Sequence, residues 1–226
     1  MPFLGRYAKH LYVFQRTPSS VDSRGNTPTD PEWVKTLKPG WQKERQRNFH
    51  RWSPFEGVVF DQPDLVCDFW TELGRNMTAR IAAMDDPASL TVEQIMAIRE
   101  EEDYKVMERL RRRIDSIVED KRTAEALKPY YRFLCKRPCS NDEYLTTFNR
   151  PNVTLVDVAE SKGVERITET AVLAGGVAYE VDCIIYASGF EITTEISRRY
   201  AIDTIEAATG CRCSTTGETA TKRCTA

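Results

Sequence analysis

The chain has no long apolar run and no dominant charge, and each absence excludes a class of protein. No apolar stretch approaches the roughly 20 residues that a bilayer crossing requires, and the opening MPFLGRYAKHLYVF lacks the apolar core and cleavage site of a signal peptide. The net charge is −2, with 32 basic and 34 acidic side chains, whereas nucleic-acid-binding proteins usually carry an excess of Lys and Arg. We therefore expect a cytoplasmic protein without a membrane segment or a nucleic-acid partner, and its oligomeric state stays open.

Metal ligands are also scarce. The chain has two His residues, and its seven Cys residues include no two pairs at the spacing of a zinc site. Cys135 and Cys139 flank a Lys-Arg pair, but they have no partner pair of ligands elsewhere. We expect no metal site and, in a reducing compartment, no disulfides.

The remaining composition is that of a globular protein. With 226 residues, of which 41% are hydrophobic and 29% charged, the chain can bury the core of one or two domains. The apolar run Leu11–Gln15, closed by Pro18, predicts a buried strand, and the segment 18–32 has the composition of a loop. The stretch Trp33–Trp52 is expected to form two short helices that are separated at Pro39-Gly40.

Two longer helices are expected next. We predict them at Asp64–Met84 and Thr91–Asp120, and the second opens with a capping box formed by Thr91 and Gln94. Its apolar residues mostly recur at helical spacing, which predicts a stripe that packs into the core. The members of this stripe are Val92, Ile95, Met96, Met107, Leu110, Ile114, Ile117 and Val118.

Strands dominate after a short helix at Thr123–Tyr131. They are expected at Val153–Val158, at Glu165–Thr168 and in a hairpin around Gly175-Gly176. The apolar run Val181–Phe190 ends at small residues, which is typical of a central parallel strand that runs toward a ligand. This order of elements predicts an α/β fold with a helical insertion.

Three segments carry a resemblance to one family. They are FQRTP at Phe14–Pro18, CKRP at Cys135–Pro138 followed by FNRPNVTLVD at Phe148–Asp157, and DCIIYASGF at Asp182–Phe190. In this order they resemble the Baeyer–Villiger monooxygenases, class B flavin-containing monooxygenases that use NADPH and dioxygen to insert an oxygen atom beside a ketone carbonyl. The resemblance implies NADP(H) and FAD as cofactors, and a small-molecule ketone that is converted to an ester or lactone.

The resemblance, which runs from about Met1 to Glu206, also implies a division of the chain. Residues 1–30 would be part of a Rossmann-like NADP domain, residues 31–131 a helical insertion, and residues 132–206 the rest of the NADP domain with strands that return toward an FAD domain. The last 20 residues, 207–226, contain no Val, Ile, Leu, Met, Phe, Trp or Tyr. We expect them to be a disordered, non-native tail produced by a frameshift.

The resemblance further implies the site residues. Arg16 and Thr17 follow a strand where Rossmann-type domains contact the adenosine ribose, and a basic residue there favours the 2′-phosphate of NADP. Lys136 falls where the family also contacts NADP. Arg137 falls where the family places its catalytic arginine, whose fixed charge stabilises the negative charge that develops during oxygen insertion. The small-residue turn that would let the backbone approach the flavin consists of Ala187, Ser188, Gly189 and Phe190.

Other interpretations stay open at this point. By local pattern alone, Arg16 ends a polar strand and the Lys136-Arg137 pair lies in an exposed turn. The chain also has no Gly-x-Gly-x-x-Gly loop of the kind with which the family binds both nucleotides, so we expect doubtful FAD binding and little or no catalysis by this chain alone.

Two alternative functions are also kept. The chain could be part of a flavin monooxygenase that oxidises nitrogen or sulfur, or residues 31–131 could be a non-catalytic helical module that docks a partner through exposed aromatic residues. The aromatic residues of the second alternative are Trp33, Trp41, Trp52, Phe69 and Trp70.

Overall fold

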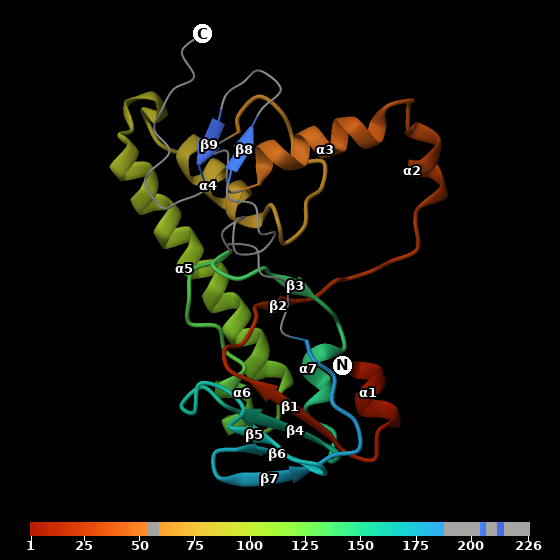
Figure 1. Cartoon of the computed structure of the whole chain (residues 1–226). Coiled ribbons are helices and arrows are strands. Elements are labelled where there is room, and N and C mark those ends of the chain that lie inside the picture. Colours follow the sequence, from red (N-terminus) through yellow and green to blue (C-terminus); the bar gives the residue numbers. More distant parts are fainter. Residues whose placement is uncertain (54–58, 188–203, 207–211, 215–226) are drawn as a thin grey trace. The chain divides into compact units, whose positions relative to one another are not determined.

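Short parallel strand pairs and one long helix organise the chain. The computed structural model describes residues 1–53, 59–187, 204–206 and 212–214, which fall into two units, Met1–Val181 and Asp182–Ala226 (Figure 1). The described elements are, in chain order, α1 (Pro2–Tyr7), β1 (Leu11–Gln15), β2 (Val21–Asp22), α2 (Pro31–Thr36), α3 (Trp41–Trp52), α4 (Glu72–Ala82), the 3-10 turn η1 (Pro87–Ser89), α5 (Val92–Ile117), α6 (Lys121–Ala126), β3 (Cys139–Ser140), α7 (Tyr144–Thr147), β4 (Val153–Asp157), β5 (Arg166–Ile167), β6 (Ala171–Ala174), β7 (Val177–Glu180), β8 (Thr204–Glu206) and β9 (Arg212–Ser214).

The strand β1 pairs in parallel with β4, although the two are far apart in the sequence. The register runs from Leu11 opposite Val153 to Gln15 opposite Asp157. β1 has the predicted bounds, and β4 ends one residue before the predicted Val158. A parallel pair requires a long crossover, and here that crossover contains the whole helical segment between the two strands.

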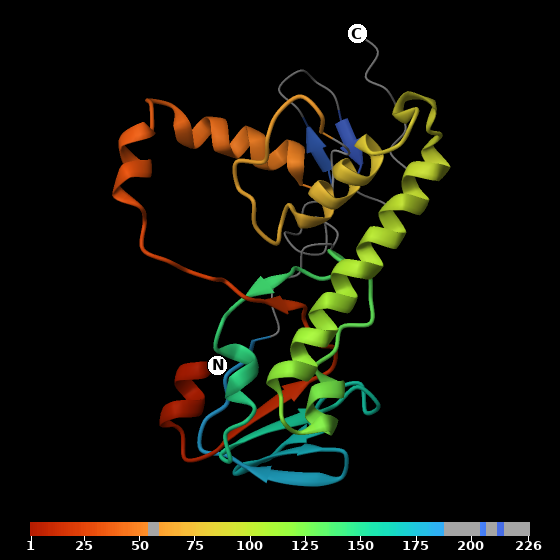
Figure 2. The same cartoon turned by 180° about the vertical axis from the view of Figure 1, so that it is seen from behind.

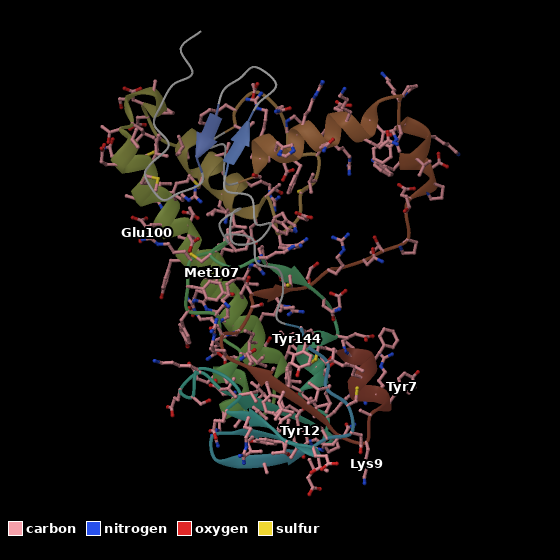
Figure 3. All side chains as sticks on the ribbon, in the orientation of Figure 1. Tyr7, Lys9, Tyr12, Glu100, Met107 and Tyr144 are labelled. Carbon is pink, nitrogen blue, oxygen red and sulfur yellow. The ribbon has the colours of Figure 1, made fainter. Side chains whose placement is uncertain are left out.

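Two further sheets complete the strand order of the first unit. The two-residue strands β2 and β3 pair in parallel, with Val21 opposite Cys139 and Asp22 opposite Ser140. β5, β6 and β7 form an antiparallel sheet, and Gly175 and Gly176 make the turn between β6 and β7 at positive φ, as the hairpin prediction requires. This sheet packs against β4 and β1, and Tyr12, labelled in Figure 3, meets Tyr179 edge-on at 5.1 Å between ring centroids.

The helix α5 connects two of the three apolar clusters of the first unit. Thr91 and Gln94 form the predicted capping box at its start. Its middle turns pack on α4 around Met107 (labelled in Figure 3), and its last turns pack on α6, α7 and β4 around Ile114. Figure 2 shows α5 from behind, extending from α4 to the end of the unit that holds β1 and β4. The helical segment and the strands therefore share one structural support.

The stripe predicted along α5 is correct for its later turns and wrong for its start. Met107, Leu110 and Ile114 are buried, but Val92 and Met96 are exposed. α4 runs antiparallel to α5, and its last turn reaches only as far as the ion pair between Arg80 and Glu102. In the first turns of α5, Ile95 packs against the cluster around Met107 and Ile98 is buried, so only the side of these turns that carries Val92 and Met96 is left uncovered.

Local signals set the course of α2, α3 and α4. Gly40 lies at φ +92°, a left-handed backbone that separates α2 from α3 where the sequence predicts a break. The predicted helix at Asp64–Met84 is shorter than expected, because Asp64 and Asp68 accept hydrogen bonds from backbone N–H groups two residues later and hold the chain in turns before α4 begins.

The aromatic residues of the helical segment pack within it. Trp52 is buried, and Trp33, Trp41, Phe69 and Trp70 are half-buried, so none of them is exposed. Trp33 meets Trp41 edge-on at 6.0 Å between ring centroids, and Phe69 lies against the cluster around Met107. This burial contradicts the alternative in which these residues are exposed anchors for a partner.

The strand predicted over Val181–Phe190 is not found in the part of this segment that the structure describes. β7 ends at Glu180, and Val181–Ala187 has no strand, with Ile185 and Tyr186 exposed. A buried parallel strand needs neighbouring strands on both sides, and no described strand pairs with this run. Residues 188–190 lie outside the described residues. β8 and β9 form an antiparallel pair, and the prediction of a non-native tail over 207–226 stays a prediction.

Candidate functional site

Arg16 and Thr17 lie directly after the parallel pair of β1 and β4. The carbonyl oxygen of Gln15 accepts a hydrogen bond from the N–H of Val158 at 2.9 Å, and the Gln15 side chain donates to the carbonyl of Ala126, also at 2.9 Å. These contacts fix the end of β1. Both residues that follow are exposed to solvent.

A second parallel pair brings the Lys136-Arg137 segment to the same place. β2 begins four residues after Thr17, and β3 begins two residues after Arg137. The Cys139 N–H donates to the carbonyl of Ser20 at 2.9 Å. Because parallel strands run in the same direction, the residues that precede β2 and β3 lie at the same end of the pair. We call residues 16–20 and 135–139 the paired segments.

The turn that leads into Lys136 is held from α5. The Asp103 carboxylate, on α5, accepts a hydrogen bond from the Phe133 N–H at 2.9 Å, and both residues are buried. Leu134 has a φ of +69°, a left-handed backbone that costs free energy at a residue other than glycine. Burial raises the pKa of Asp103, although the Phe133 N–H and neighbouring Arg residues oppose this.

The cations of the paired segments are not committed to other groups. Arg16 and Arg137 are exposed, Lys136 is half-buried, and none of the three forms an ion pair with the described residues. Arg109 on α5 differs, because it binds Asp22 of β2 and Glu72 of α4, each at 2.6 Å. The paired segments can therefore offer positive charge to an anion that does not belong to the described chain.

The fit of these residues to the two nucleotides differs. Two cationic segments at one end of a parallel pair suit a phosphate. The buried hydroxyl of Ser20, the last residue of the first segment, has no hydrogen-bond partner among the described residues. These groups fit the phosphorylated ribose of NADP. The described residues offer no comparable site for the phosphates of FAD, because no described helix begins at a glycine-rich loop. Ala187 is exposed, and Ser188, Gly189 and Phe190 lie outside the described residues.

Sequence reasoning missed three residues that build this site. Tyr131, Asp103 and Arg109 each join segments that are far apart in the chain. For Asp103 the available signal was its place four residues before Met107 of the predicted stripe, since buried charged residues need partners. Arg109 is exposed on the same helix and gave no such signal. Nothing in the local sequence marks Tyr131.

The described residues include neither a cluster of metal ligands nor a membrane-spanning helix. No group of three or more His, Cys, Asp or Glu in the described ranges could hold a metal ion. Within the same ranges, no helix has the length and apolar character needed to cross a membrane.

Known proteins are similar to most of the chain. No family model matches it. Neopentalenolactone D synthase from Streptomyces avermitilis is 53% identical over 194 residues, which make up 84% of this chain and 31% of that protein. A Baeyer–Villiger monooxygenase from Stachybotrys chlorohalonatus is 50% identical over 203 residues, or 88% of this chain and 31% of that protein. The chain thus spans about a third of the length of these curated relatives.

Solved structures show the same similarity. A polycyclic ketone monooxygenase from the thermophilic fungus Thermothelomyces thermophila is 41% identical, with a TM-score of 0.65 over 80% of this chain and 29% of that one. Another solved structure that is similar to this chain is a complex with FAD and NADP. These matches confirm the α/β fold class that the order of elements predicts.

Proposed function

The chain is a relative of the Baeyer–Villiger monooxygenases, and we propose that it carries the NADP-phosphate contacts and the catalytic arginine of such an enzyme. The observation that supports this proposal most directly is the parallel pairing of β2 with β3, which brings Arg16 and Thr17 to the same end as Lys136 and Arg137. These are the residues that the family resemblance implies, and 119 to 121 positions of sequence separate Arg16 and Thr17 from Lys136 and Arg137.

Each cation has a distinct role in this proposal. Arg16 pairs with the 2′-phosphate of NADP through its planar guanidinium, and Thr17 donates its hydroxyl to the same phosphate. Lys136 provides a mobile point charge toward the phosphate or ribose. Arg137, which is exposed and has no ion pair among the described residues, is free to stabilise the negative charge that develops when a ketone carbonyl is attacked.

The activity of the whole enzyme follows as a wider proposal. It is the NADPH- and dioxygen-dependent conversion of a ketone to an ester or lactone, in the cytoplasm, with FAD supplying the oxygen-insertion chemistry when it is bound. Ala187, Ser188, Gly189 and Phe190 would form a small-residue turn that lets the backbone approach FAD. The relatives named as Baeyer–Villiger monooxygenases favour ketone oxidation over oxidation of nitrogen or sulfur. This chain by itself is expected to show little or no catalysis.

Cofactor selectivity tests the nucleotide part of the proposal. The 226-residue chain is titrated with NADPH and NADH, and we expect tighter binding of NADPH. Arg16→Gln should reduce this preference about tenfold or more, because it removes a charge-assisted hydrogen bond. The matched control is Arg166→Gln, which neutralises an exposed arginine of β5 outside the paired segments. Equal affinities for both nucleotides in the unmodified chain would contradict the proposal.

The role of Arg137 needs a complete enzyme. Residues 1–181 of this chain can replace the homologous segment of a full-length relative, and product formation from a ketone is followed by mass spectrometry with NADPH consumption. Arg137→Ala should abolish the ester or lactone, whereas Arg166→Ala should not. Undiminished product from the Arg137 variant would remove Arg137 from the reaction and leave the nucleotide contacts unaffected.

A further inference from the structure

Tyr131 connects the two paired segments through its hydroxyl group. This hydroxyl donates a hydrogen bond to the carbonyl of Pro18 at 2.9 Å and accepts one from the N–H of Ser20 at 3.0 Å. One hydroxyl thus binds two backbone groups on either side of Ser19. A hydroxyl can donate once and still accept, so both contacts form at the same time.

The position of Tyr131 makes it a rigid support for this contact. Its ring packs against the apolar cluster around Met107. On one side of it, Arg111 of α5 donates to the carbonyl of Pro129 at 3.0 Å, and on the other side the Phe133 N–H is bound by Asp103. Burial raises the pKa of the Tyr131 hydroxyl, with the nearby Cys135 and Cys139 thiols adding to the effect. The hydroxyl therefore keeps its proton, and the bond to Pro18, across the neutral range.

The hydrogen bond from Tyr131 to Pro18 lies directly after Arg16 and Thr17 in the chain. These two residues make no hydrogen bond or ion pair of their own with the described chain. The backbone on their N-terminal side is fixed at Gln15 by the Val158 N–H, and the backbone on their C-terminal side is fixed at Pro18 by Tyr131. Without the hydroxyl, the nearest fixed point after Thr17 would be the carbonyl of Ser20, where β2 begins.

We propose that Tyr131 is a positioning residue for the recognition of a 2′-phosphate: its hydroxyl fixes the Pro18–Ser20 backbone and so places Arg16 and Thr17 beside the Lys136 segment. The inference rests on the proposed function, because it assumes that these cations bind NADP. The consequence for binding is that Tyr131 contributes to the selectivity for nucleotides with a 2′-phosphate over those without it. Loss of the hydroxyl lowers affinity for a nucleotide with the 2′-phosphate and leaves affinity for one without it nearly unchanged.

The test uses the 226-residue chain and two probes, adenosine 2′,5′-bisphosphate and adenosine 5′-monophosphate. The variant is Tyr131→Phe, which removes only the hydroxyl. The matched control is Tyr130→Phe, which removes the hydroxyl of the neighbouring, exposed tyrosine that donates to Glu125. Dissociation constants for both probes are measured by calorimetry, and their ratio gives the contribution of the 2′-phosphate.

We expect Tyr131→Phe to reduce this ratio about fivefold to tenfold, the size expected for one lost hydrogen bond, and Tyr130→Phe to leave it within about twofold. A general loss of folded protein would weaken both probes equally and would not change the ratio. An unchanged ratio in Tyr131→Phe would overturn the inference alone. A wild-type chain that binds both probes equally would overturn the proposed function, and the inference with it.

A second measurement covers the case in which Tyr131→Phe does not fold. Hydrogen exchange of the unmodified chain reports on the Ser20 N–H, which is protected if the Tyr131 hydroxyl accepts from it. Protection of the Ser20 amide comparable to that of Val158 in the β1 to β4 ladder is the expected result. Exchange of the Ser20 amide at the rate of an open loop would overturn the inference without any variant.

Discussion

Arg109→Met should destabilise the first unit more than the same substitution at Arg112, another exposed arginine of α5. The Arg109 guanidinium binds Asp22 at 2.6 Å and Glu72 at 2.6 Å, and the two carboxylate side chains are only 10% and 21% exposed. The bonds to both partners also raise the pKa of Arg109, although burial opposes this, so its charge is permanent. Removing the cation leaves two poorly hydrated carboxylates close to each other, and β2 and α4 lose the ion-pair bridge between them.

The expected magnitude follows from this burial. Breaking a fully buried ion pair by removing one partner costs about 3–5 kcal/mol, and we reduce this to about 2–3 kcal/mol because the Arg109 side chain is 42% exposed. With a urea m value of about 2–3 kcal/mol/M, the unfolding midpoint should fall by about 1 M. Far-ultraviolet circular dichroism during urea titration measures it.

A matched variant on the same helix controls for the change of residue type. Arg112 is 78% exposed, and its Nε lies 3.6 Å from Glu108. Arg112→Met should cost less than about 0.5 kcal/mol, as is usual for exposed pairs. Equal midpoints for the two variants would refute the reasoning, because the bridge between β2 and α4 would then contribute no more than a surface contact.

Two further perturbations test the packing and the support of the site. Burial raises the pKa of Asp103, so ionisation of its carboxyl opposes folding once the pH rises above the ordinary Asp pKa of about 3.9. The stability of Asp103→Asn relative to the wild type should therefore increase as the pH rises from this value, and a stability difference independent of pH would contradict this. Gly74→Ala should cost about 1–3 kcal/mol in the same urea titration, since its Cβ would lie 2.5 Å from the backbone oxygen of Trp52, whereas Ala79→Ser on the same helix should cost less than about 1 kcal/mol.

Local features of the fold could be predicted from the sequence. β1 is a contiguous apolar run between polar ends, the capping box of α5 needs only Thr91 and Gln94, and the break at Gly40 follows from the conformational freedom of glycine. In each case the residues that determine the structure are within a few positions of one another. The predicted burial of Val92 and Met96 in the first turns of α5 was wrong, because helical spacing does not reveal which side of a turn is covered by a neighbouring element.

The candidate site was predictable only in part. A resemblance to a family implied Arg16, Lys136 and Arg137, but no local pattern shows that they lie at one end of a parallel pair. The contacts that bring them together join residues 113 positions apart, as between Tyr131 and Pro18, and 87 positions apart, as between Arg109 and Asp22. Such partners are chosen by the tertiary structure, so spacing along the chain does not indicate them.

The most direct test of the central claim, that the paired segments form one phosphate-binding site, is a nuclear magnetic resonance titration of the 226-residue chain with adenosine 2′,5′-bisphosphate. We predict that the amide resonances of Arg16, Thr17, Lys136 and Arg137 shift together and give one dissociation constant, while those of α2 and α3 stay in place. Shifts confined to one of the two segments, or different dissociation constants for the two, would contradict the account.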